Sequence, residues 1–250
     1  MGERIRRIPP PSWEGQVKAL IRRRYAHFAE SDRFSHKGNE RAKKAGYPTD
    51  LLCALPSRII ETYSGCGYLL EGLDLSKSKV VVDLGCGCGL DSFLVAMKME
   101  KKGLLIAVDL TSAMLGRLME VRDEMSKKNN STVVPLSGDM ESLPLKAEIA
   151  DLVIANASFN LTINQKTAFK EAARILRPGG RLVARELIRE GPLSADLALD
   201  PMAWNTSLGG VLEEVELDSI ICSAGFAEVQ FSSHQPFPPV TAVRVEAIKP

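Results

Sequence analysis

Short apolar runs recur along the chain from residue 79 onward, and each predicts a buried strand. The runs at 80–84 and 103–108 are rich in Val, Leu and Ile, the composition of strands buried on both faces of a sheet. Further runs of this kind lie at 132–135, 151–155 and 181–186. Between the runs, apolar residues recur three and four positions apart, which favours helices. Alternating strands and helices predict a mostly parallel α/β sheet.

The predicted helices lie at 90–99, 113–128, 165–177 and 213–224. Met114 and Met125 fall at core positions of the second helix, so we interpret them as packing residues. After the last helix, two alternating segments at 227–232 and 241–248 predict a pair of strands joined by the Pro-rich stretch 234–239. We find no internal repeat and no second core.

The first 75 residues show a different pattern. Residues 1–12 contain three consecutive prolines and predict a loose arm, and residues 13–29 carry one apolar face and predict a helix. The polar stretch 30–46 predicts irregular structure, and the apolar pattern at 51–63 is broken by Pro56. We therefore divide the chain into a helical N-terminal extension, 1–75, and a main domain, 76–250. The extension either packs over the mouth of a ligand site or lies along a sheet edge.

The first strand leads into a turn with three glycines, Gly85, Gly87 and Gly89. Such a turn allows a ligand to approach the backbone closely, but it is a weak indication by itself. The second strand ends at Asp109, 20 residues after Gly89, about where a dinucleotide fold places a ribose-binding carboxylate. A helix-capping Asp before Thr111 is the alternative.

The charge around this turn disfavours a pyrophosphate ligand. Asp83 and Asp91 flank the turn, residues 80–95 contain no Lys or Arg, and the third glycine comes one position too early for G-x-G-x-x-G. A ligand with an ammonium group, a sulfonium and a ribose suits these carboxylates. S-adenosylmethionine is that ligand, and an NAD-dependent dehydrogenase becomes a distant alternative.

The motifs resemble those of class I S-adenosylmethionine-dependent methyltransferases. They are the glycine turn at 80–89, Val-Asp at 108–109, Gly-Asp-Met-Glu at 138–141 with Leu-Pro at 143–144, and Leu-Arg-Pro-Gly-Gly at 176–180. The resemblance implies a Rossmann-like α/β fold with a seven-stranded sheet whose last strand is antiparallel. It implies that Asp139 lies at the adenine edge, Asp109 at the ribose and the glycine turn near the methionine moiety. The cofactor-binding residues that we predict are Asp83, Gly85, Cys86, Gly87, Gly89, Asp91, Asp109, Leu110, Thr111, Met114, Asp139, Met140 and Asn156.

A narrower resemblance is to arsenite methyltransferases, carried by Tyr-Ser-Gly-Cys-Gly at 63–67, Gly-Leu-Asp at 89–91, Asn-Leu at 160–161 and the segment 204–212. That family is expected to bind trivalent arsenic with thiolates, soft ligands for a soft centre. Cys66 falls at one family cysteine position, but Ala157 and Ser207 stand at two others and no Cys precedes Cys53. We expect a relative with a different acceptor, or an arsenite enzyme with a divergent set of thiols. The predicted acceptor pocket comprises Ala157, Phe159, Trp204 and Ser207.

Tyr63, Cys66 and Glu186 are the predicted catalytic residues. Glu186 ends a strand at the ligand-binding edge, with a helix cap or surface ion pair as its alternative role. Cys66 is either reactive or structural. Two other titratable side chains, His27 and His36, lie in the N-terminal extension. No metal site is predicted, because the Cys-x-Cys at 86–88 belongs to the turn.

Composition limits the partners. The 250 residues carry a net charge of +1, although residues 1–49 hold 12 Lys or Arg and 5 Asp or Glu, a net of +7. A nucleic-acid methyltransferase that uses this basic segment is one alternative, but Asn-Ala-Ser-Phe at 156–159 lacks the prolines of the motif in base-methylating enzymes. A non-catalytic binding protein is another. The absence of a signal peptide or membrane span and the odd count of five cysteines favour a cytoplasmic protein that acts on a small molecule.

Overall fold

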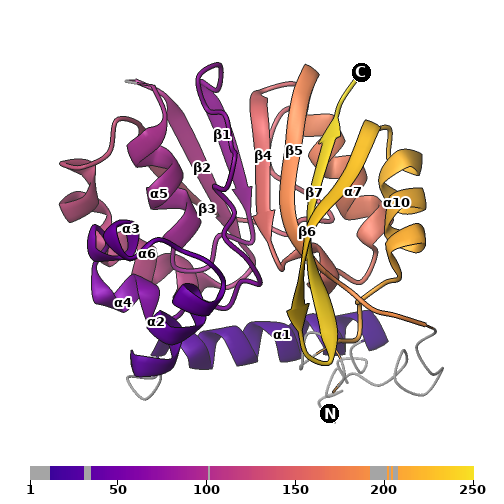
Figure 1. Cartoon of the computed structure of the whole chain (residues 1–250), viewed down its shortest axis with the longest axis horizontal. Helices are drawn as coiled ribbons and strands as arrows, with labels where there is room; N and C mark the ends of the chain where they lie inside the picture. Colours follow the sequence, from indigo (N-terminus) through magenta and orange to yellow (C-terminus); the bar gives the residue numbers. More distant parts are fainter. Residues whose placement is uncertain (1–11, 31–34, 101, 192–201, 203, 205–207) are drawn as a thin grey trace, which may run out of the picture.

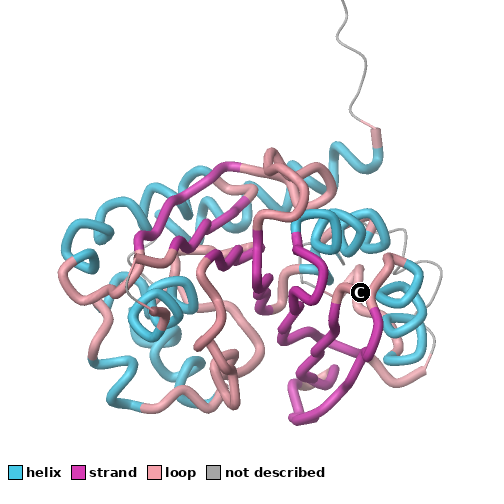
Figure 2. Tube along the Cα trace, turned by 90° about the horizontal axis from the view of Figure 1, so that it is seen from above, coloured by secondary structure: helices cyan, strands magenta, loops and turns pink. Residues whose placement is uncertain are grey.

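The computed structural model describes residues 12–30, 35–100, 102–191, 202, 204 and 208–250. In this part of the chain, seven strands form one sheet between helices that flank both faces (Figures 1 and 2). The strands are β1 (Val80–Leu84), β2 (Leu104–Asp109), β3 (Thr132–Ser137), β4 (Ala150–Asn156), β5 (Leu176–Ile188), β6 (Ala227–Phe237) and β7 (Val240–Ile248).

Helices precede and connect the strands. They are α1 (Trp13–Glu30), α2 (Ser35–Lys44), α3 (Thr49–Cys53), α4 (Ser57–Ile60), α5 (Leu90–Lys98), α6 (Ser112–Ser126), α7 (Gln165–Ile175) and α10 (Glu214–Ser223), with a 3₁₀ turn, η2, at Phe159–Leu161. Side chains of α2–α6 pack on one face of the sheet and those of α7 and α10 on the other. None of the described helices is long and apolar enough to cross a bilayer.

Strand order is β3-β2-β1-β4-β5-β7-β6. The first five strands are parallel, and β7 enters between β5 and β6 antiparallel to both. The expected Rossmann-like sheet is therefore confirmed. The order reverses beside β1, so the carboxyl ends of β1 and β4 diverge there, and open α/β sheets bind their ligands at such a point.

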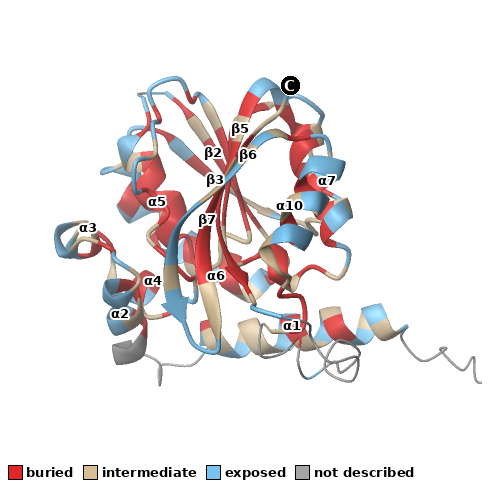
Figure 3. Cartoon of the chain, turned by 45° about the vertical axis from the view of Figure 1, so that its right-hand side comes forward, coloured by how far each residue is buried: buried red, intermediate tan, exposed pale blue. Residues whose placement is uncertain are grey.

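Alternate residues of the central strands enter opposite layers of the core. Val81 and Leu105 pack with α5 and α6, whereas their neighbours Val82 and Ile106 pack with α7 and α10. This period of two follows from strand geometry. Because both faces are covered, the inner strands are mostly buried, as the continuous apolar runs predict, whereas the two outer strands, β3 and β6, are partly exposed (Figure 3).

The prediction of irregular structure at 30–46 is wrong, since α2 is a regular helix there. Its packing residues are small. Ala42 is fully buried, and a Cβ on Gly38 would come within 2.2 Å of the Glu61 carbonyl oxygen. A helix that buries Gly and Ala presents no apolar periodicity, so the sequence pattern misses it.

Two boundaries also differ from expectation. The strand predicted at 181–186 begins at Leu176, because Leu176 pairs with Ala150 and the Gly179 N–H donates to the Lys249 carbonyl. The connector predicted at 234–239 is mostly strand, since β6 runs to Phe237 and pairs there with Val240. In both places, pairing across the sheet overrides local Pro and Gly content.

Candidate functional site

A cavity lies at the carboxyl edge of the sheet, where β1, β2, β3 and β4 end and α1 passes across them (Figure 1). We call it the main cavity. It has about 730 Å³ of empty space, part of which is open to solvent. Its lining residues are Lys18, Ile21, Tyr25, Ser64, Gly85, Gly87, Val108, Asp109, Leu110, Thr111, Gly138, Asp139, Met140, Glu141, Asn156, Ala157, Ser158, Leu161 and Thr162.

A second, smaller cavity adjoins it around the glycine turn. This glycine-turn cavity has about 370 Å³ of empty space and shares four lining residues with the main cavity: Ser64, Gly85, Gly87 and Asn156. Its other walls come from Tyr63, the thiols of Cys86 and Cys88, and Asp91. The two cavities therefore form an elongated site on either side of the turn.

The glycine turn requires its glycines. Gly85, Gly87 and Gly89 have φ values of +74°, +55° and +93°, the left-handed region that disfavours side chains. A Cβ at Gly85 would lie 2.4 Å from the Cβ of Ser158, whereas a Cβ at Gly87 would meet no atom within 4 Å. Gly87 therefore presents bare backbone to open space, and Gly89 begins α5.

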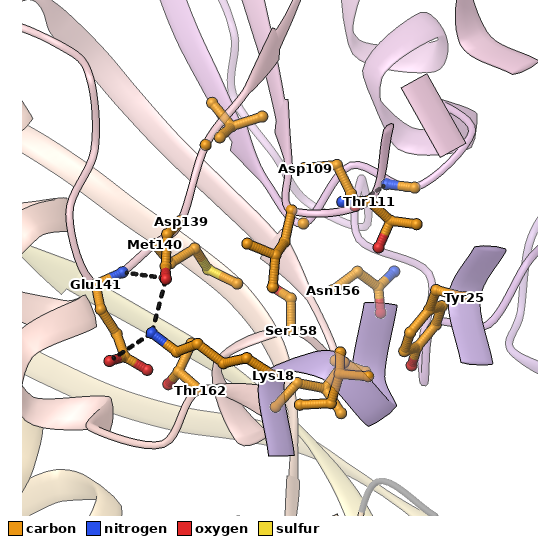
Figure 4. A pocket seen from close by; sticks show the side chains of 18 of the residues that line it. Lys18, Tyr25, Asp109, Thr111, Asp139, Met140, Glu141, Asn156, Ser158 and Thr162 are labelled. Carbon is orange, nitrogen blue, oxygen red and sulfur yellow. Dashed lines mark hydrogen bonds and ion pairs between the residues drawn. The ribbon is translucent and has the colours of Figure 1, made fainter. Parts of the chain in front are cut away.

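Asp109 lies at the end of β2 and lines the main cavity (Figure 4). One carboxylate oxygen accepts the Gly87 N–H at 2.9 Å, and the other accepts the Thr111 N–H at 2.7 Å. Burial raises the pKa of Asp109, and these two backbone donors oppose the shift. Asp109 does not cap α6, whose N-cap is Thr111 without a side-chain cap hydrogen bond. Each carboxylate oxygen of Asp109 keeps a second lone pair for a ligand.

Asp139 and Glu141 form the opposite end of the main cavity, where Lys18 of α1 binds both (Figure 4). The Lys18 ammonium lies 2.7 Å from an oxygen of Asp139 and 3.0 Å from an oxygen of Glu141. Partial burial lowers the pKa of Lys18, but the two carboxylates together raise it by more than burial lowers it. The pKa of Lys18 is therefore above its ordinary value. The first helix is thereby tied to the loop after β3.

Asn156, the last residue of β4, is the centre of a polar network. Its amide nitrogen donates to the Asp91 carboxylate at 2.9 Å and to the Gly67 carbonyl at 2.9 Å. Its oxygen accepts the Cys66 N–H. Asp91 also accepts the Tyr47 hydroxyl at 2.6 Å. Burial raises the pKa of Asp91 to about 6, so the carboxylate at the wall of the glycine-turn cavity is mostly ionised at neutral pH.

Several predicted cofactor residues lie behind the cavity walls. Asp83 is 2% exposed and accepts the Ser92 hydroxyl, and burial raises its pKa to about 8. Met114 is buried under α1, with its sulfur 3.2 Å from that of Cys88. By contrast, Leu110, Thr111 and Met140 line the main cavity as predicted.

The three predicted catalytic residues lie in different environments. Tyr63 lines the glycine-turn cavity, and burial raises its pKa well above 10. Cys66 is buried beside Leu187 and Val211 and lines neither cavity. Burial also raises the pKa of its thiol.

Glu186 also lies outside the lining of both cavities and is 1% exposed. Its carboxylate accepts the backbone N–H groups of Ser158, Phe159 and Asn160 at 3.0–3.3 Å, which caps η2. Burial raises its pKa to about 7. Of the roles considered for Glu186, the structure therefore shows that of a helix cap.

The predicted acceptor residues are not all brought together. Ala157 lines the main cavity. Phe159 is fully buried and stacks on Phe169, with ring centroids 3.9 Å apart. Trp204 packs against Val17 and Ile21 of α1. Ser207 lies outside the described residues.

Sequence reasoning missed cavity residues on α1, above all Lys18 and Tyr25. The helix itself was predicted, but no local pattern indicates that Lys18 binds an acid 121 positions away. Ser158 and Thr162 were also missed, although both follow the predicted Asn156. No group of three His, Cys, Asp or Glu side chains that could hold a metal ion occurs among the residues described.

A methyltransferase domain model matches residues 75–225, more than half of the chain. The chain belongs to this methyltransferase family. Phosphoethanolamine N-methyltransferase 2 from Haemonchus contortus, solved in complex with S-adenosylmethionine, has a similar fold, with a TM-score of 0.62 and 14% identity over 85% of this chain and 60% of that one. The main and glycine-turn cavities have the features expected for such a cofactor, since Asp109 lines one, Asp91 lines the other, and the bare glycine turn lies between them.

This family member is similar in sequence to several proteins named arsenite methyltransferases. One from Halobacterium salinarum is 28% identical over 237 residues, which cover 87% of this chain and 59% of the relative. The chain thus spans little more than half the length of such relatives. An arsenic(III) methyltransferase from Chlamydomonas reinhardtii has the same fold, with a TM-score of 0.68 and 22% identity over 80% of this chain and 72% of that one.

Proposed function

We propose that the protein transfers the methyl group of S-adenosylmethionine to a small-molecule acceptor other than arsenite. The observation that supports a different acceptor is Ala157. It lines the main cavity directly after Asn156, at a position where the arsenite methyltransferase pattern has a thiol. A methyl side chain cannot bind a metalloid, so this wall of the site favours a neutral or carbon-rich group.

The remaining thiols are poorly suited to arsenic. Cys66 is 2% exposed in an apolar cluster, and burial keeps its thiol protonated by raising its pKa. Burial likewise raises the pKa of Cys86, and that of Cys88 to about 11. Since the thiolate is the ligand, not the thiol, none of these three is prepared for capture at neutral pH.

The chain supplies binding, orientation and exclusion of water, while the cofactor supplies an electrophilic methyl group on sulfur. Asp109 accepts the ribose hydroxyls with its free lone pairs. The backbone of Gly87 allows the ligand to pass close to the turn. Asp91, held by Tyr47 and Asn156, attracts the ammonium group. Tyr63 stays protonated and acts as a donor, and the catalytic roles predicted for Tyr63, Cys66 and Glu186 remain to be tested.

We assign α1 the role of a cover over the acceptor side of the site. Lys18, Ile21 and Tyr25 project from it into the main cavity (Figure 4). The predicted division at residue 75 stays a prediction. Within the extension, α1 borders the cavity, whereas residues of the later helices such as Leu52 and Ile59 belong to the core of the sheet.

The experiment that tests this function incubates the protein with S-adenosylmethionine, glutathione and either arsenite or small-molecule extract fractions. Element-specific detection reports methylarsenic, and mass spectrometry reports other methylated products. We expect little or no methylarsenic from the wild type and more from the double variant Ala157→Cys, Ser207→Cys. Fast arsenite methylation by the wild type would overturn the proposal.

An arsenite methyltransferase with a divergent thiol set is the second candidate. The observation in its favour is that Cys86 and Cys88 both line the glycine-turn cavity. If this candidate is correct, Cys86→Ser with Cys88→Ser abolishes arsenite methylation while S-adenosylhomocysteine still binds. Cys53→Ser, at an exposed thiol, is the matched control.

A further inference from the structure

Arg41 of α2 carries a guanidinium whose hydrogen bonds are incomplete. Its Nε and one terminal nitrogen are inaccessible to solvent and have no acceptor among the described residues. A buried cationic donor without an acceptor is costly, because it has lost water and gained no partner. Native proteins satisfy nearly all such groups, so these two nitrogens call for an acceptor that the described residues do not supply.

The electrostatic surroundings of Arg41 contain no described carboxylate that compensates its charge. Burial lowers the pKa of Arg41, the Arg24 guanidinium lowers it further, and the hydroxyls of Tyr63 and Tyr25 act in the opposite direction. The two buried arginines among the described residues, Arg185 and Arg244, show the usual arrangement. Arg185, fully buried, binds the Glu71 carboxylate at 2.6 Å and donates to two backbone carbonyls.

Arg41 lines neither cavity, but two tyrosines whose charges act on it line one cavity each. Tyr63 lines the glycine-turn cavity and Tyr25 lines the main cavity. Helix α2 packs closely on the end of α4, where Gly38 contacts the carbonyls of Ile60 and Glu61. Arg41 lies one helical turn after Gly38, so its side chain shares that face of α2.

The site also lacks a cation for an anionic ligand group. Among the described residues that line either cavity, Lys18 is the single Lys or Arg, and it is engaged by Asp139 and Glu141. Asp91 stands in the wall of the glycine-turn cavity and repels a carboxylate. A carboxylate that enters this region therefore needs a positive partner from behind the wall.

We propose that Arg41 is a carboxylate receptor of the site, which binds either the methionine carboxylate of the cofactor or a carboxylate of the acceptor. The inference deepens the proposed function and rests on it. A guanidinium offers two parallel N–H donors that match the two oxygens of a carboxylate. No other anion needs to be invoked, since a carboxylate supplies both acceptors that Arg41 lacks.

The test compares Arg41→Gln with the wild type by calorimetry, using two ligands. S-adenosylhomocysteine has the methionine-derived carboxylate, and 5′-deoxy-5′-methylthioadenosine lacks the whole amino-acid portion. If the cofactor is the source, Arg41→Gln weakens S-adenosylhomocysteine binding by about tenfold to a hundredfold and changes methylthioadenosine binding less than about twofold. If the carboxylate belongs to the acceptor, Arg41→Gln leaves the affinities for both ligands unchanged. In that case succinate, as a carboxylate probe, raises the melting temperature of the wild-type S-adenosylhomocysteine complex but not that of the Arg41→Gln complex.

Two further variants keep the test decisive. Lys43→Gln removes an exposed charge from the same helix and is expected to change none of these values. Arg41→Lys keeps the charge without the paired donors and is expected to show a smaller loss than Arg41→Gln in whichever arm applies. Without ligand, Arg41→Gln is expected to melt at or above the wild-type temperature, because an unsatisfied cation is removed.

Three results separate failure of this inference from failure of the proposed function. If Arg41→Gln and Arg41→Lys both melt lower without ligand and bind the two nucleosides equally less well, Arg41 is structural and the inference is wrong. Unchanged affinities together with no effect of succinate on the wild type also overturn it. If the wild type does not bind S-adenosylhomocysteine at all, the proposed function itself fails.

Discussion

At the scale of single residues, the site is a set of carboxylates that differ in what holds them. Asp109 accepts two backbone N–H groups and faces the main cavity. Glu186 accepts three and faces the η2 turn. Asp109 ends β2 and Glu186 lies two residues before the end of β5, at the same edge of the sheet. The direction of the side chain decides which of them is available to a ligand.

The Asp109→Asn variant is expected to bind S-adenosylhomocysteine at least about tenfold more weakly, because a charged acceptor contributes about 1.5–3 kcal/mol. Asparagine keeps one acceptor oxygen for the turn, so the fold is preserved. Calorimetry measures the effect. The control is Asp123→Asn, whose side chain is 92% exposed on α6. Equal affinities of wild type and Asp109→Asn would contradict the ribose assignment.

The pKa of Glu186 gives the protein a pH-dependent stability. Between the ordinary value of 4.5 and the folded value of about 7, the folded chain holds a proton that the unfolded chain releases. The free energy of unfolding therefore falls as pH rises through this window, by up to about 1.4 kcal/mol per pH unit for this group. Asp83 and Asp91 act in the same direction, since their pKa values are raised to about 8 and about 6.

Glu186→Gln is expected to flatten this dependence between pH 4.5 and 7, because the amide does not titrate and still offers an oxygen to the η2 turn. Urea unfolding at intervals across this range measures the slope. Glu124→Gln, at a half-exposed position of α6, is the control and should keep the wild-type slope. An identical slope in Glu186→Gln would mean that Glu186 is ionised throughout.

Sequence pattern predicts Asp109 well but not Lys18, and the reason is distance along the chain. Asp109 follows from local features, a strand and a glycine turn 20 residues earlier. The pairing of Lys18 with Asp139 depends on how α1 crosses the sheet, which no local pattern records. The direction of Glu186 likewise depends on the backbone of residues 158–160, from another element.

At the scale of elements, α1 differs from the other N-terminal helices. It lies across the carboxyl edge of the sheet (Figure 1), and Lys18 fastens it to the loop after β3. The Lys18 and Asp139 side chains are 23% and 28% exposed, so water screens their ion pair and its contribution to stability is about 1 kcal/mol or less. Buried apolar contacts of Val17, Ile21 and Ala29 also hold α1, so the ion pair is one of several attachments of this cover.

Lys18→Ala is expected to speed amide hydrogen exchange in α1 and dissociation of S-adenosylhomocysteine, with a small loss of stability. Exchange mass spectrometry and stopped-flow dissociation measure the two rates. Arg23→Ala changes an exposed residue of equal charge on the same helix and should leave both rates near those of the wild type. If the Lys18 variant dissociates no faster, α1 does not govern access.

Element prediction succeeds where apolar residues carry the packing and fails where they do not. The strand at Val80–Leu84 is found with its predicted bounds, because all five positions face a covered side of the sheet. Helix α2 was missed because Gly38 and Ala42 make its contacts. The sequence pattern also misses the early start of β5 and the late end of β6, because pairing with neighbouring strands sets these bounds.

At the scale of the whole molecule, the N-terminal helices and the sheet share one core. Tyr47, Leu52 and Ile59 belong to the same buried cluster as Leu105 and Leu152 of the central strands. The extension and the main domain are therefore joined by apolar contact as well as by the chain. This arrangement makes separate unfolding of the two parts unfavourable.

We expect Leu52→Ala to destabilise the entire chain by about 2–5 kcal/mol, since Leu52 is 2% exposed in this shared core. The loss should appear in one transition that coincides by far-UV circular dichroism and by tryptophan fluorescence. Leu51→Ala, at the partly buried neighbouring position, is expected to cost less. Two separate transitions, with only the first shifted, would show that the extension unfolds alone.

Ala157 adopts a left-handed backbone, with φ of +53°, and its N–H is fixed by the Arg185 carbonyl at 2.7 Å. For a residue with a Cβ this conformation costs about 1–2 kcal/mol, and the alanine already bears it. Replacing it by another L-residue adds side-chain atoms to the cavity without a new demand on the backbone. In evolutionary terms, this residue of the cavity wall, which we propose meets the acceptor, can change by single mutations while the fold is preserved. A scaffold that once served one acceptor can thereby acquire another without passing through an unstable intermediate.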